Sequence, residues 1–355
     1  MNIIFVIYRL GTGGAERVSV LLAEYLKEQG HNVSVLVYRN DGSYEINNNI
    51  PVVKMPDSSN FFLKHIKRIF FFFKYAKDET DLVITLYRGY DFTWLYRKFS
   101  KSKLILSQRN DPKAEYDNNI SARIQCKLFF NGADAVVFQT REEMEYFNRS
   151  IRKKGVLIPN PVKQDLPTPY SGEREKVIVN FCRLTPQKNL KLLIDSFERI
   201  HYSYPDYCMR IYGDGEQKEE LERYIRTKGL SEKVKILPFS KEIHTNVRRA
   251  AMYVSSSDYE GISNSMLEAM ALGIPCICTD CPAGGARMVI KNGINGILVP
   301  VGDISEMVKA MKKLIENPNY SKYLGKEAEK IRETFSIQKI CNKWEKLIEI
   351  LMAEK

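Results

Sequence analysis

The sequence predicts an α/β protein built from two Rossmann-like, doubly wound domains that face a cleft. Short apolar runs alternate with stretches of helical spacing along the chain, which is typical of parallel sheets covered by helices. A proline-rich segment near the middle interrupts this alternation once. With 355 residues, the chain also exceeds one ordinary domain core and fits two domains.

The first half begins with a strand–loop–helix–strand unit. An apolar run over 2–7 precedes a glycine loop over 11–14, helical spacing over 15–29 and a second apolar run over 32–37. Further strands are expected at 81–86, 103–107 and 135–138. The N-terminal run lacks a basic start and a small-residue cleavage site, so we interpret it as a strand and not as a signal peptide.

The segment 158–172 contains four prolines within eleven residues and is interpreted as a linker, since proline continues neither a helix nor a central strand. Strands are then expected at 176–181, 207–212, 234–237, 252–255 and 275–279, and helices at 190–200, 216–228 and from about 263. We assign one Rossmann-like domain to 1–163 and a second to 164–335. A C-terminal helix over 336–355 is expected to cross back to the first domain.

Composition and charge narrow the functional classes. The formal charge is +11, and residues 1–160 hold 24 basic and 17 acidic side chains, which favours phosphorylated ligands or an anionic membrane. Nucleic acid is disfavoured, because no zinc-finger spacing, RNP-like motif or long basic run occurs. Seven mostly isolated cysteines indicate a reduced compartment, and no run of eighteen apolar residues occurs. We expect a cytoplasmic protein.

The glycine loop Gly11-Thr12-Gly13-Gly14 lies between a strand and a helix, where backbone amides can face a phosphate. It is not the dinucleotide fingerprint, because Glu16 stands where that motif needs glycine or alanine. The second strand ends in Tyr38-Arg39-Asn40, without a carboxylate for a ribose. A tight turn without a ligand stays an open alternative.

Two segments of the second half carry the chemistry. Arg183 and Lys188 follow a strand and precede a helix, a place where cations can neutralise a diphosphate, although both could be ordinary surface charges. In Glu260-Gly-Ile-Ser-Asn-Ser-Met-Leu-Glu268, a loop carboxylate, a helix start capped by Ser263 or Asn264 and a second carboxylate can together bind sugar, phosphate and ribose. Two glutamates eight residues apart also occur by chance.

The motifs taken together resemble the retaining glycosyltransferases of the GT-B fold, family 4, above all bacterial enzymes of lipid-linked or surface polysaccharide synthesis such as capsule or lipopolysaccharide. The resemblance covers nearly the whole chain in the expected order. It is carried by Gly13-Gly14-Ala-Glu16-Arg17, Ile158-Pro-Asn-Pro-Val162, Arg183 with Lys188-Asn189, and the run Tyr259–Val301, which includes Ala269–Pro275, Cys281–Gly285 and Asn292–Pro300.

The resemblance implies a nucleotide-sugar donor, such as a UDP-sugar, held between the domains. It also implies that 1–163 is the acceptor-binding domain and 164–335 the donor-binding domain. By the matching positions Glu260 would contact the donor sugar, Glu268 the ribose, and Arg183 and Lys188 the diphosphate. The remaining donor contacts would come from Gly13, Gly14, Gly261, Ile262, Ser263 and Asn264, with Phe239 and Ser240 beside the uracil.

Two positions depart from the family pattern. Many relatives place a histidine in the N-terminal domain against the donor sugar, and Arg109 in the loop 107–112 is the candidate here. Met288 stands where relatives often carry glutamate, so we assign it no role.

No metal is expected. The sequence contains no Asp-x-Asp, the pair that metal-dependent GT-A enzymes use for a diphosphate. Cys276, Cys278 and Cys281 would supply three zinc ligands without a nearby histidine, so buried structural cysteines are the favoured interpretation.

The segment Phe61–Lys77, FFLKHIKRIFFFFKYAK, is a candidate membrane-docking helix. At helical spacing Phe62, Ile66, Ile69 and Phe73 share one side. Interspersed cations could meet anionic lipid, and Lys64, Lys67 and Arg68 are the obvious positions for charge reversal. The alternative is a sheet-packing helix.

We therefore predict a metal-independent hexosyl- or N-acetylhexosaminyltransferase. It would act on a lipid-linked or oligosaccharide acceptor at the inner face of the membrane. A nucleotide-sugar epimerase and a non-catalytic sugar-nucleotide-binding module remain as alternatives, with a dinucleotide enzyme further behind.

Overall fold

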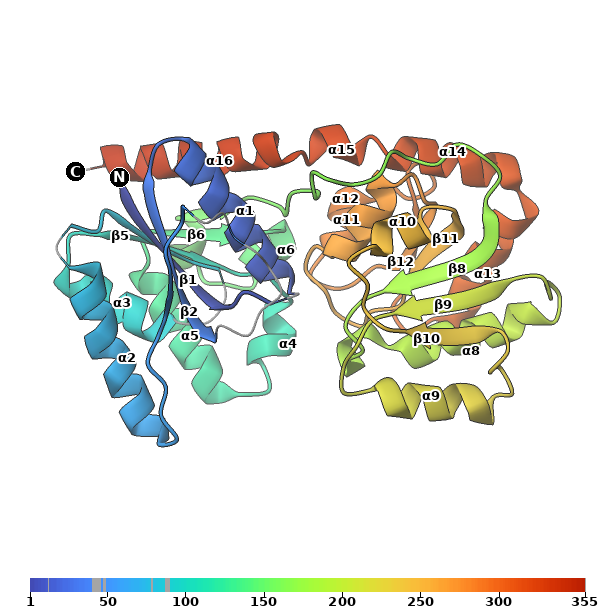
Figure 1. Cartoon of the computed structure of the whole chain (residues 1–355), viewed down its shortest axis with the longest axis horizontal. Coiled ribbons are helices and arrows are strands. Elements are labelled where there is room, and N and C mark those ends of the chain that lie inside the picture. Colours follow the sequence, from blue (N-terminus) through green and yellow to red (C-terminus); the bar gives the residue numbers. More distant parts are fainter. Residues whose placement is uncertain (12, 40–45, 47–48, 78, 87–89, 355) are drawn as a thin grey trace. The chain divides into compact units, whose positions relative to one another are not determined.

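The computed structural model describes residues 1–11, 13–39, 46, 49–77, 79–86 and 90–354, with only the backbone of Phe61 and Phe62. Thr12 and Asn40 of the sequence motifs lie outside the described residues. The chain forms two compact units, Met1–Pro161 with Ile337–Lys355, and Val162–Ser336. Each unit holds one parallel sheet with helices on both faces (Figure 1).

The described residues of the first unit form a seven-stranded parallel sheet of order β3-β2-β1-β4-β5-β6-β7. Phe5 of β1 pairs with Val35 of β2 on one side and with Ile84 of β4 on the other. The strand order therefore reverses at β1, the topological switch point of a doubly wound sheet. The strands are β1 (Asn2–Arg9), β2 (Asn32–Arg39), β3 (Val52–Lys54), β4 (Leu82–Thr85), β5 (Lys103–Ser107), β6 (Ala135–Phe138) and β7 (Gly155–Leu157).

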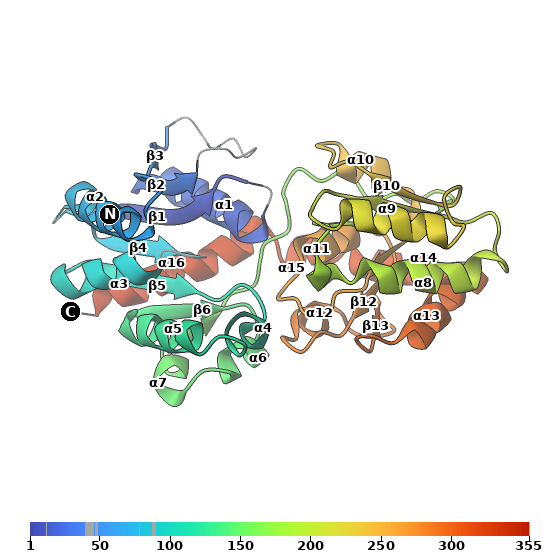
Figure 2. The ribbon, with the colours of Figure 1, turned by 90° about the horizontal axis from the view of Figure 1, so that it is seen from below.

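Helices cover both faces of this sheet. In Figures 1 and 2, α2, α3 and α5 lie on one face, and α1 and α16 on the other. The first face is filled by aromatic rings, among them the buried Phe72, Phe92 and Phe130. The helices are α1 (Gly14–Glu28), α2 (Phe61–Ala76), α3 (Tyr90–Phe99), α4 (Pro112–Tyr116), α5 (Ile120–Gly132), α6 (Arg141–Glu145), α7 (Arg149–Arg152) and α16 (Ile337–Ala353).

The C-terminal helix α16 belongs to the core of the first unit, although the second unit precedes it in sequence. Its buried side chains recur at helical spacing and include Trp344 and Ile348. The hydroxyl of Tyr25 on α1 donates to Asn342 Oδ1 at 2.9 Å. The segment therefore packs as one layer of the first unit.

The second unit repeats the same topology. Its described residues form a six-stranded parallel sheet of order β10-β9-β8-β11-β12-β13, which reverses at β8. Val177 and Val179 face one hydrophobic cluster and Ile178 faces the other, so both faces are buried and the strands read as continuous apolar runs. The strands are β8 (Glu175–Phe181), β9 (Cys208–Tyr212), β10 (Val234–Leu237), β11 (Ala250–Ser255), β12 (Cys276–Thr279) and β13 (Ile297–Val299).

The helices of the second unit connect these strands in the right order for parallel crossovers. They are the 3₁₀ turn η1 (Pro186–Lys188), α8 (Leu190–His201), α9 (Lys218–Thr227), α10 (Ile243–Val247), α11 (Asn264–Ala271), α12 (Gly285–Val289), α13 (Ile304–Glu316), α14 (Pro318–Ala328) and α15 (Ile331–Thr334). Among the described residues, no helix has the length and apolar character needed to cross a bilayer.

The helix predicted over 61–77 is α2, but its orientation differs from the prediction. The side chain of Phe62 lies outside the described part of the chain. Ile69 and Phe73 pack against the core beside the fully buried Phe72, which fixes the inward face. The apolar residues that face outward are Leu63, Ile66 and Phe70.

Two of the three cations expected on a lipid-facing side have other partners, which corrects that prediction. Arg68 is buried with its guanidinium 4.3 Å from the ring centroid of Tyr38, and its Nε donates to Pro56 O at 3.2 Å. Lys64 forms an ion pair of 2.6 Å with Asp57. Lys67 is exposed.

Candidate active site in the second unit

The candidate site lies where the strand order of the second sheet reverses. β8 and β11 are hydrogen-bonded neighbours there, and their carboxyl ends carry two successive loops. The loop after β8 contains Arg183 and Lys188, and the loop after β11 contains Glu260. Ligands of doubly wound sheets bind outside the carboxyl ends at this switch point. The topology thus brings together side chains that are more than seventy residues apart in the sequence.

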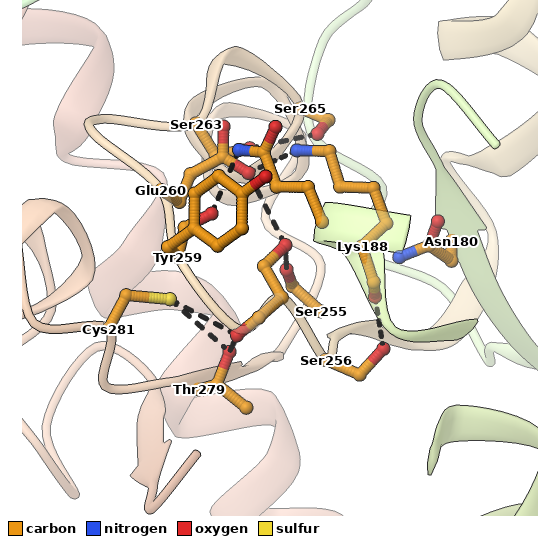
Figure 3. A network of polar contacts seen from close by, with 12 residues as sticks. Asn180, Lys188, Ser255, Ser256, Tyr259, Glu260, Ser263, Ser265, Thr279 and Cys281 are labelled. Atoms are coloured by element: carbon orange, nitrogen blue, oxygen red, sulfur yellow. Dashed lines mark hydrogen bonds and ion pairs between the residues drawn. The ribbon is translucent and has the colours of Figure 1, made fainter. Parts of the chain in front are cut away.

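The two loops are bound to each other by side chains (Figure 3). Lys188 Nζ and Glu260 Oε2 form an ion pair and hydrogen bond. Three further side-chain hydrogen bonds cross between the loops: Ser256 Oγ to Lys188 O at 2.9 Å, Gln187 Nε2 to Tyr259 O at 2.8 Å, and Asn189 Nδ2 to Asp258 Oδ1 at 2.7 Å. The positions of the cation and the carboxylate are therefore set by several neighbours and not by their ion pair alone.

The end of β12 and the loop after it hold the Glu260 loop in place. Thr279 Oγ1 donates to Ser257 O at 2.6 Å, and Cys281 Sγ donates to the same carbonyl at 3.2 Å. Ser257 Oγ in turn donates to Glu260 Oε2 at 3.3 Å. Preorganised groups of this kind lose little free energy to reorganisation when a ligand binds.

Electrostatics keep Lys188 charged. Burial opposes its charged form, but the Glu260 carboxylate outweighs burial and raises the pKa of Lys188 above the ordinary value of 10.5. The neighbouring Cys182 is half-buried, and loss of solvation raises the pKa of its thiol to about 12. At neutral pH the site therefore holds an ammonium group and a protonated thiol, not a thiolate nucleophile.

Arg183 lies at the end of β8, close enough to Lys188 for mutual repulsion. Its side chain is exposed and has no acidic partner among the described residues. The charge of Lys188 is partly neutralised by Glu260, so Arg183 contributes the uncompensated positive charge of this loop.

The start of α11 follows the Glu260 loop directly and belongs to the same candidate site. Ser263 occupies the N-cap position, as expected, but its side chain does not bond to the helix amides; its hydroxyl lies 3.0 Å from Ser265 Oγ. The preceding backbone packs closely against α12, because a Cβ on Gly285 would lie 1.8 Å from Gly261 O. Only glycine permits that approach. The amides of Ile262 and Asn264 lie in this segment.

Glu268 is buried inside α11 and contacts a residue that sequence reasoning assigned no role. Its Oε2 lies 2.8 Å from Nε2 of His244 on α10, which is also buried. The His244 ring makes an edge contact with Phe181 at the end of β8. A histidine 24 positions away along the chain gives no local signal of this pairing.

The loop after β10 carries Phe239 and Ser240. Phe239 is exposed, and Ser240 Oγ accepts the amide N–H of Glu242 at 3.1 Å. Met288, to which we assigned no role, is also exposed.

The predicted residues of the first unit lie in two places. Gly13 is the N-cap residue of α1 and Gly14 begins the helix. A Cβ on Gly13 would lie 1.9 Å from Glu16 Oε2, so this carboxylate covers the glycine.

Arg109 follows β5 and is partly buried within its own unit. Its Nη1 donates to Asn160 Oδ1 at 3.0 Å, and its guanidinium lies 5.5 Å from the Trp344 ring centroid. Burial lowers the pKa of Arg109 to about 10, against the attraction of Glu143. Its Nε and Nη2 are buried without a hydrogen-bond partner among the described residues.

The three neighbouring cysteines lie on or beside β12. Cys276, Cys278 and Cys281 are buried free thiols, and burial raises the pKa of Cys281 to about 12. Within the described ranges, no group of three or more histidine, cysteine or carboxylate side chains is placed to hold a metal ion.

Comparison with known proteins gives the family. The model of "Glycosyltransferase Family 4" matches residues 12–166, and that of "Glycosyl transferases group 1" matches residues 164–331, so the two follow each other along the chain. The chain belongs to the glycosyltransferases. The resemblance inferred from its motifs is confirmed.

Relatives of this glycosyltransferase span most of its length. An uncharacterized glycosyltransferase of Methanocaldococcus jannaschii is 28% identical and covers 81% of this chain and 84% of its own. The N-acetylgalactosamine-N,N'-diacetylbacillosaminyl-diphospho-undecaprenol 4-alpha-N-acetylgalactosaminyltransferase of Campylobacter jejuni is 28% identical, with 94% and 96% covered. The crystal structure of Anabaena HepE in complex with UDP has a TM-score of 0.84 at 19% identity, with 99% and 100% covered. The predicted GT-B fold is thereby confirmed.

Proposed function

We propose that this glycosyltransferase transfers a sugar, with retention of anomeric configuration, from a UDP-sugar to a lipid-linked or polysaccharide acceptor. The observation that carries the proposal is the Lys188–Glu260 pair at the switch point of the second sheet, beside the exposed Arg183. A cation held charged at this place suits a diphosphate leaving group. The UDP complex of the structural neighbour supports a uridine diphosphate donor.

The roles follow from the chemistry of each group. Lys188 has three N–H donors, of which Glu260 takes one, so the others can bind diphosphate oxygens. Arg183 adds the uncompensated charge. Glu260 keeps acceptor positions for hydroxyl groups of the donor sugar, and Glu268 for the ribose. The backbone around Gly261 and Ile262, with Ser263 and Asn264 at the start of α11, would complete the donor site.

Further donor contacts are proposed from the loop after β10 and from the first unit. Phe239 and Ser240 would lie beside the uracil, and Gly13 and Gly14 beside the diphosphate. Arg109 is proposed to face the donor sugar. Its Nε and Nη2, buried without a hydrogen-bond partner among the described residues, support an interaction beyond Asn160, whereas its contact with Trp344 supports a packing role.

The acceptor is proposed from the Campylobacter relative, whose name specifies a sugar attached to diphospho-undecaprenol. Such an acceptor lies in a membrane, so we propose that the enzyme works at the cytoplasmic face and approaches lipid through the helix of Phe61–Lys77. The outward Leu63, Ile66 and Phe70, with the exposed Lys67, support this arrangement.

The proposal is tested by incubating the protein with a panel of UDP-sugars and a detergent-dispersed bacterial lipid extract. Released UDP and glycosylated lipid are measured by mass spectrometry, and the anomeric configuration by NMR. We expect transfer with retention. Isomerised UDP-sugar would indicate an epimerase, and binding without turnover would indicate a non-catalytic module.

The same assay tests metal use. Because Arg183 and Lys188 can neutralise the diphosphate, we expect full activity in excess EDTA. Loss of activity that Mg²⁺ or Mn²⁺ restores would contradict this part of the proposal.

A further inference from the structure

One face of the first unit carries exposed apolar side chains on three helices. On α2 these are Leu63, Ile66 and Phe70, the last 73% exposed; on α3 it is Phe99, 76% exposed. On α5 the exposed residues are Ile120, Ile124 and Leu128, the first two 66% and 62% exposed. We call these seven side chains the α2–α3–α5 surface. They are nearly half of the large exposed apolar residues in the described part of the chain.

The three helices are neighbours. The ring centroids of Phe73 on α2 and Phe99 on α3 lie 6.3 Å apart, and those of Trp94 on α3 and Phe129 on α5 lie 5.8 Å apart. Figure 2 shows α3 and α5 side by side on the face of the sheet that α2 also covers.

The stripe on α5 is regular. Ile120, Ile124 and Leu128 recur every four residues, so they share one side of the helix. Cys126 and Phe130, on the opposite side, are buried against the sheet. The helix therefore has two apolar sides, of which its own unit uses one. Contiguous exposed apolar surface of this kind marks a protein or membrane contact.

Cations predominate around this surface: α3 carries one acidic residue, Asp91, which pairs with His65 of α2 at 3.1 Å. Neither α2 nor α5 contains an acidic residue. Lys67, Lys74, Arg123 and Lys127 on these helices are exposed, and none has an acidic partner among the described residues. An apolar stripe between unpaired cations is the pattern of a helix lying in the headgroup region of an anionic bilayer.

We infer that the α2–α3–α5 surface docks on an anionic lipid bilayer, with α5 as a second membrane contact beside α2. The choice of a membrane as partner rests on the proposed function. Charge argues against a second copy of the chain on this surface. A symmetric dimer would place the same cations opposite each other, and the acids Asp57 and Asp91 already pair with Lys64 and His65 of the same chain.

The test is sedimentation of the full-length protein with vesicles. Vesicles of phosphatidylcholine with about 30% phosphatidylglycerol are compared with vesicles of phosphatidylcholine alone, at low salt. The variant Ile120→Ser/Ile124→Ser/Leu128→Ser removes the α5 stripe without touching buried residues. Tyr323→Ser/Ile350→Ser is the matched control, since it removes exposed apolar residues of α14 and α16.

We expect the wild type to sediment with the anionic vesicles and the α5 variant to lose at least tenfold in apparent vesicle affinity. The control should stay within twofold of wild type. The inference is overturned if the wild type does not sediment, if the α5 variant binds like wild type, or if the variant abolishes a dimer that the wild type forms without vesicles.

Activity separates this inference from the proposed function. The α5 variant should transfer sugar normally to detergent-dispersed lipid extract and poorly to the same extract reconstituted in anionic vesicles. If the wild type transfers nothing in detergent while it still binds vesicles, the proposed function fails and the docking surface stands. Equal loss in detergent and in vesicles would mean that the α5 substitutions damaged the enzyme itself, and would contradict the docking role.

Discussion

Lys188 is the residue on which the proposed chemistry depends most. It makes two contacts across the two loops, to Glu260 and Ser256, and its neighbours Gln187 and Asn189 make two more. Glu260 also keeps it charged. Its ammonium group therefore needs no rearrangement of the protein to meet developing negative charge on a leaving diphosphate.

Lys188→Ala should lower kcat about 10²–10³-fold, because loss of one preorganised donor costs about 2.7–4 kcal/mol at comparable sites. Steady-state kinetics of UDP release measure this. Lys191→Ala is the matched control. Lys191 lies three residues further on, pairs with Glu220 at the surface, and should leave kcat within twofold. Equal kinetics of Lys188→Ala and wild type would remove Lys188 from the site.

The pH profile adds a second check on Lys188. Its pKa is raised in the folded protein, so the ion pair is fully present below the unfolded value of 10.5 and is lost only as pH rises through the higher folded pKa. The alkaline limb of kcat should therefore not descend below about pH 10 on account of this group.

Glu268 and His244 should act together in donor binding. Glu268→Ala should raise the donor KM with little change in kcat, since a ribose contact is similar in the ground and transition states. His244→Ala should raise the same KM by about tenfold, because it removes a polar partner from a buried carboxylate. His244→Gln, whose amide can reach the same oxygen, should restore much of the loss. An effect on kcat alone would refute both roles.

Among the elements, α16 shows how a helix can be distant in sequence and central in packing. Its buried side chains pack within the first unit. Trp344, only 1% exposed, contacts the guanidinium of Arg109. Trp344→Ala should lower the free energy of unfolding by about 3–5 kcal/mol, as measured by denaturant titration. Ile350→Ala, on the exposed side of the same helix, should change it by less than about 0.5 kcal/mol. Equal effects of the two substitutions would contradict the packing described.

Prediction from sequence worked best for elements whose own residues show a clear pattern. The long buried strands β1, β5, β8 and β11 read as apolar runs between turns, so their positions and the two-domain fold followed. The strands β3, β7 and β13 were not predicted. They have three residues each, too few to show the alternation of apolar and polar residues that indicates a strand.

Contacts between side chains of different elements could not be predicted from the sequence. The pairs His244–Glu268 and Arg109–Trp344 depend on tertiary folding, and neither member is unusual in its local context. Periodicity also could not tell which apolar side of α2 or α5 faces the core, because both sides are apolar. The inward Phe72 decided the orientation of α2, and with it the burial of Arg68.

At the scale of the whole molecule, the second unit is one continuous segment that contains Arg183, Lys188, Glu260 and Glu268. A fragment of residues 162–336 should therefore fold by itself, with cooperative unfolding followed by circular dichroism, and bind UDP in calorimetry. A fragment of residues 1–161 lacks α16 and should not fold cooperatively. An unfolded second fragment, or a stable first one, would show that the two units depend on each other differently.

The return of α16 also sets an order of events during synthesis. The first 161 residues leave the ribosome before any of the second unit, yet the helix that closes their core is translated last. The second unit is complete by residue 336 and can fold while residues 1–161 still lack α16. In a growing polypeptide that segment exposes its unfinished apolar core for nearly two hundred codons, which makes it the stretch that chaperones are expected to bind.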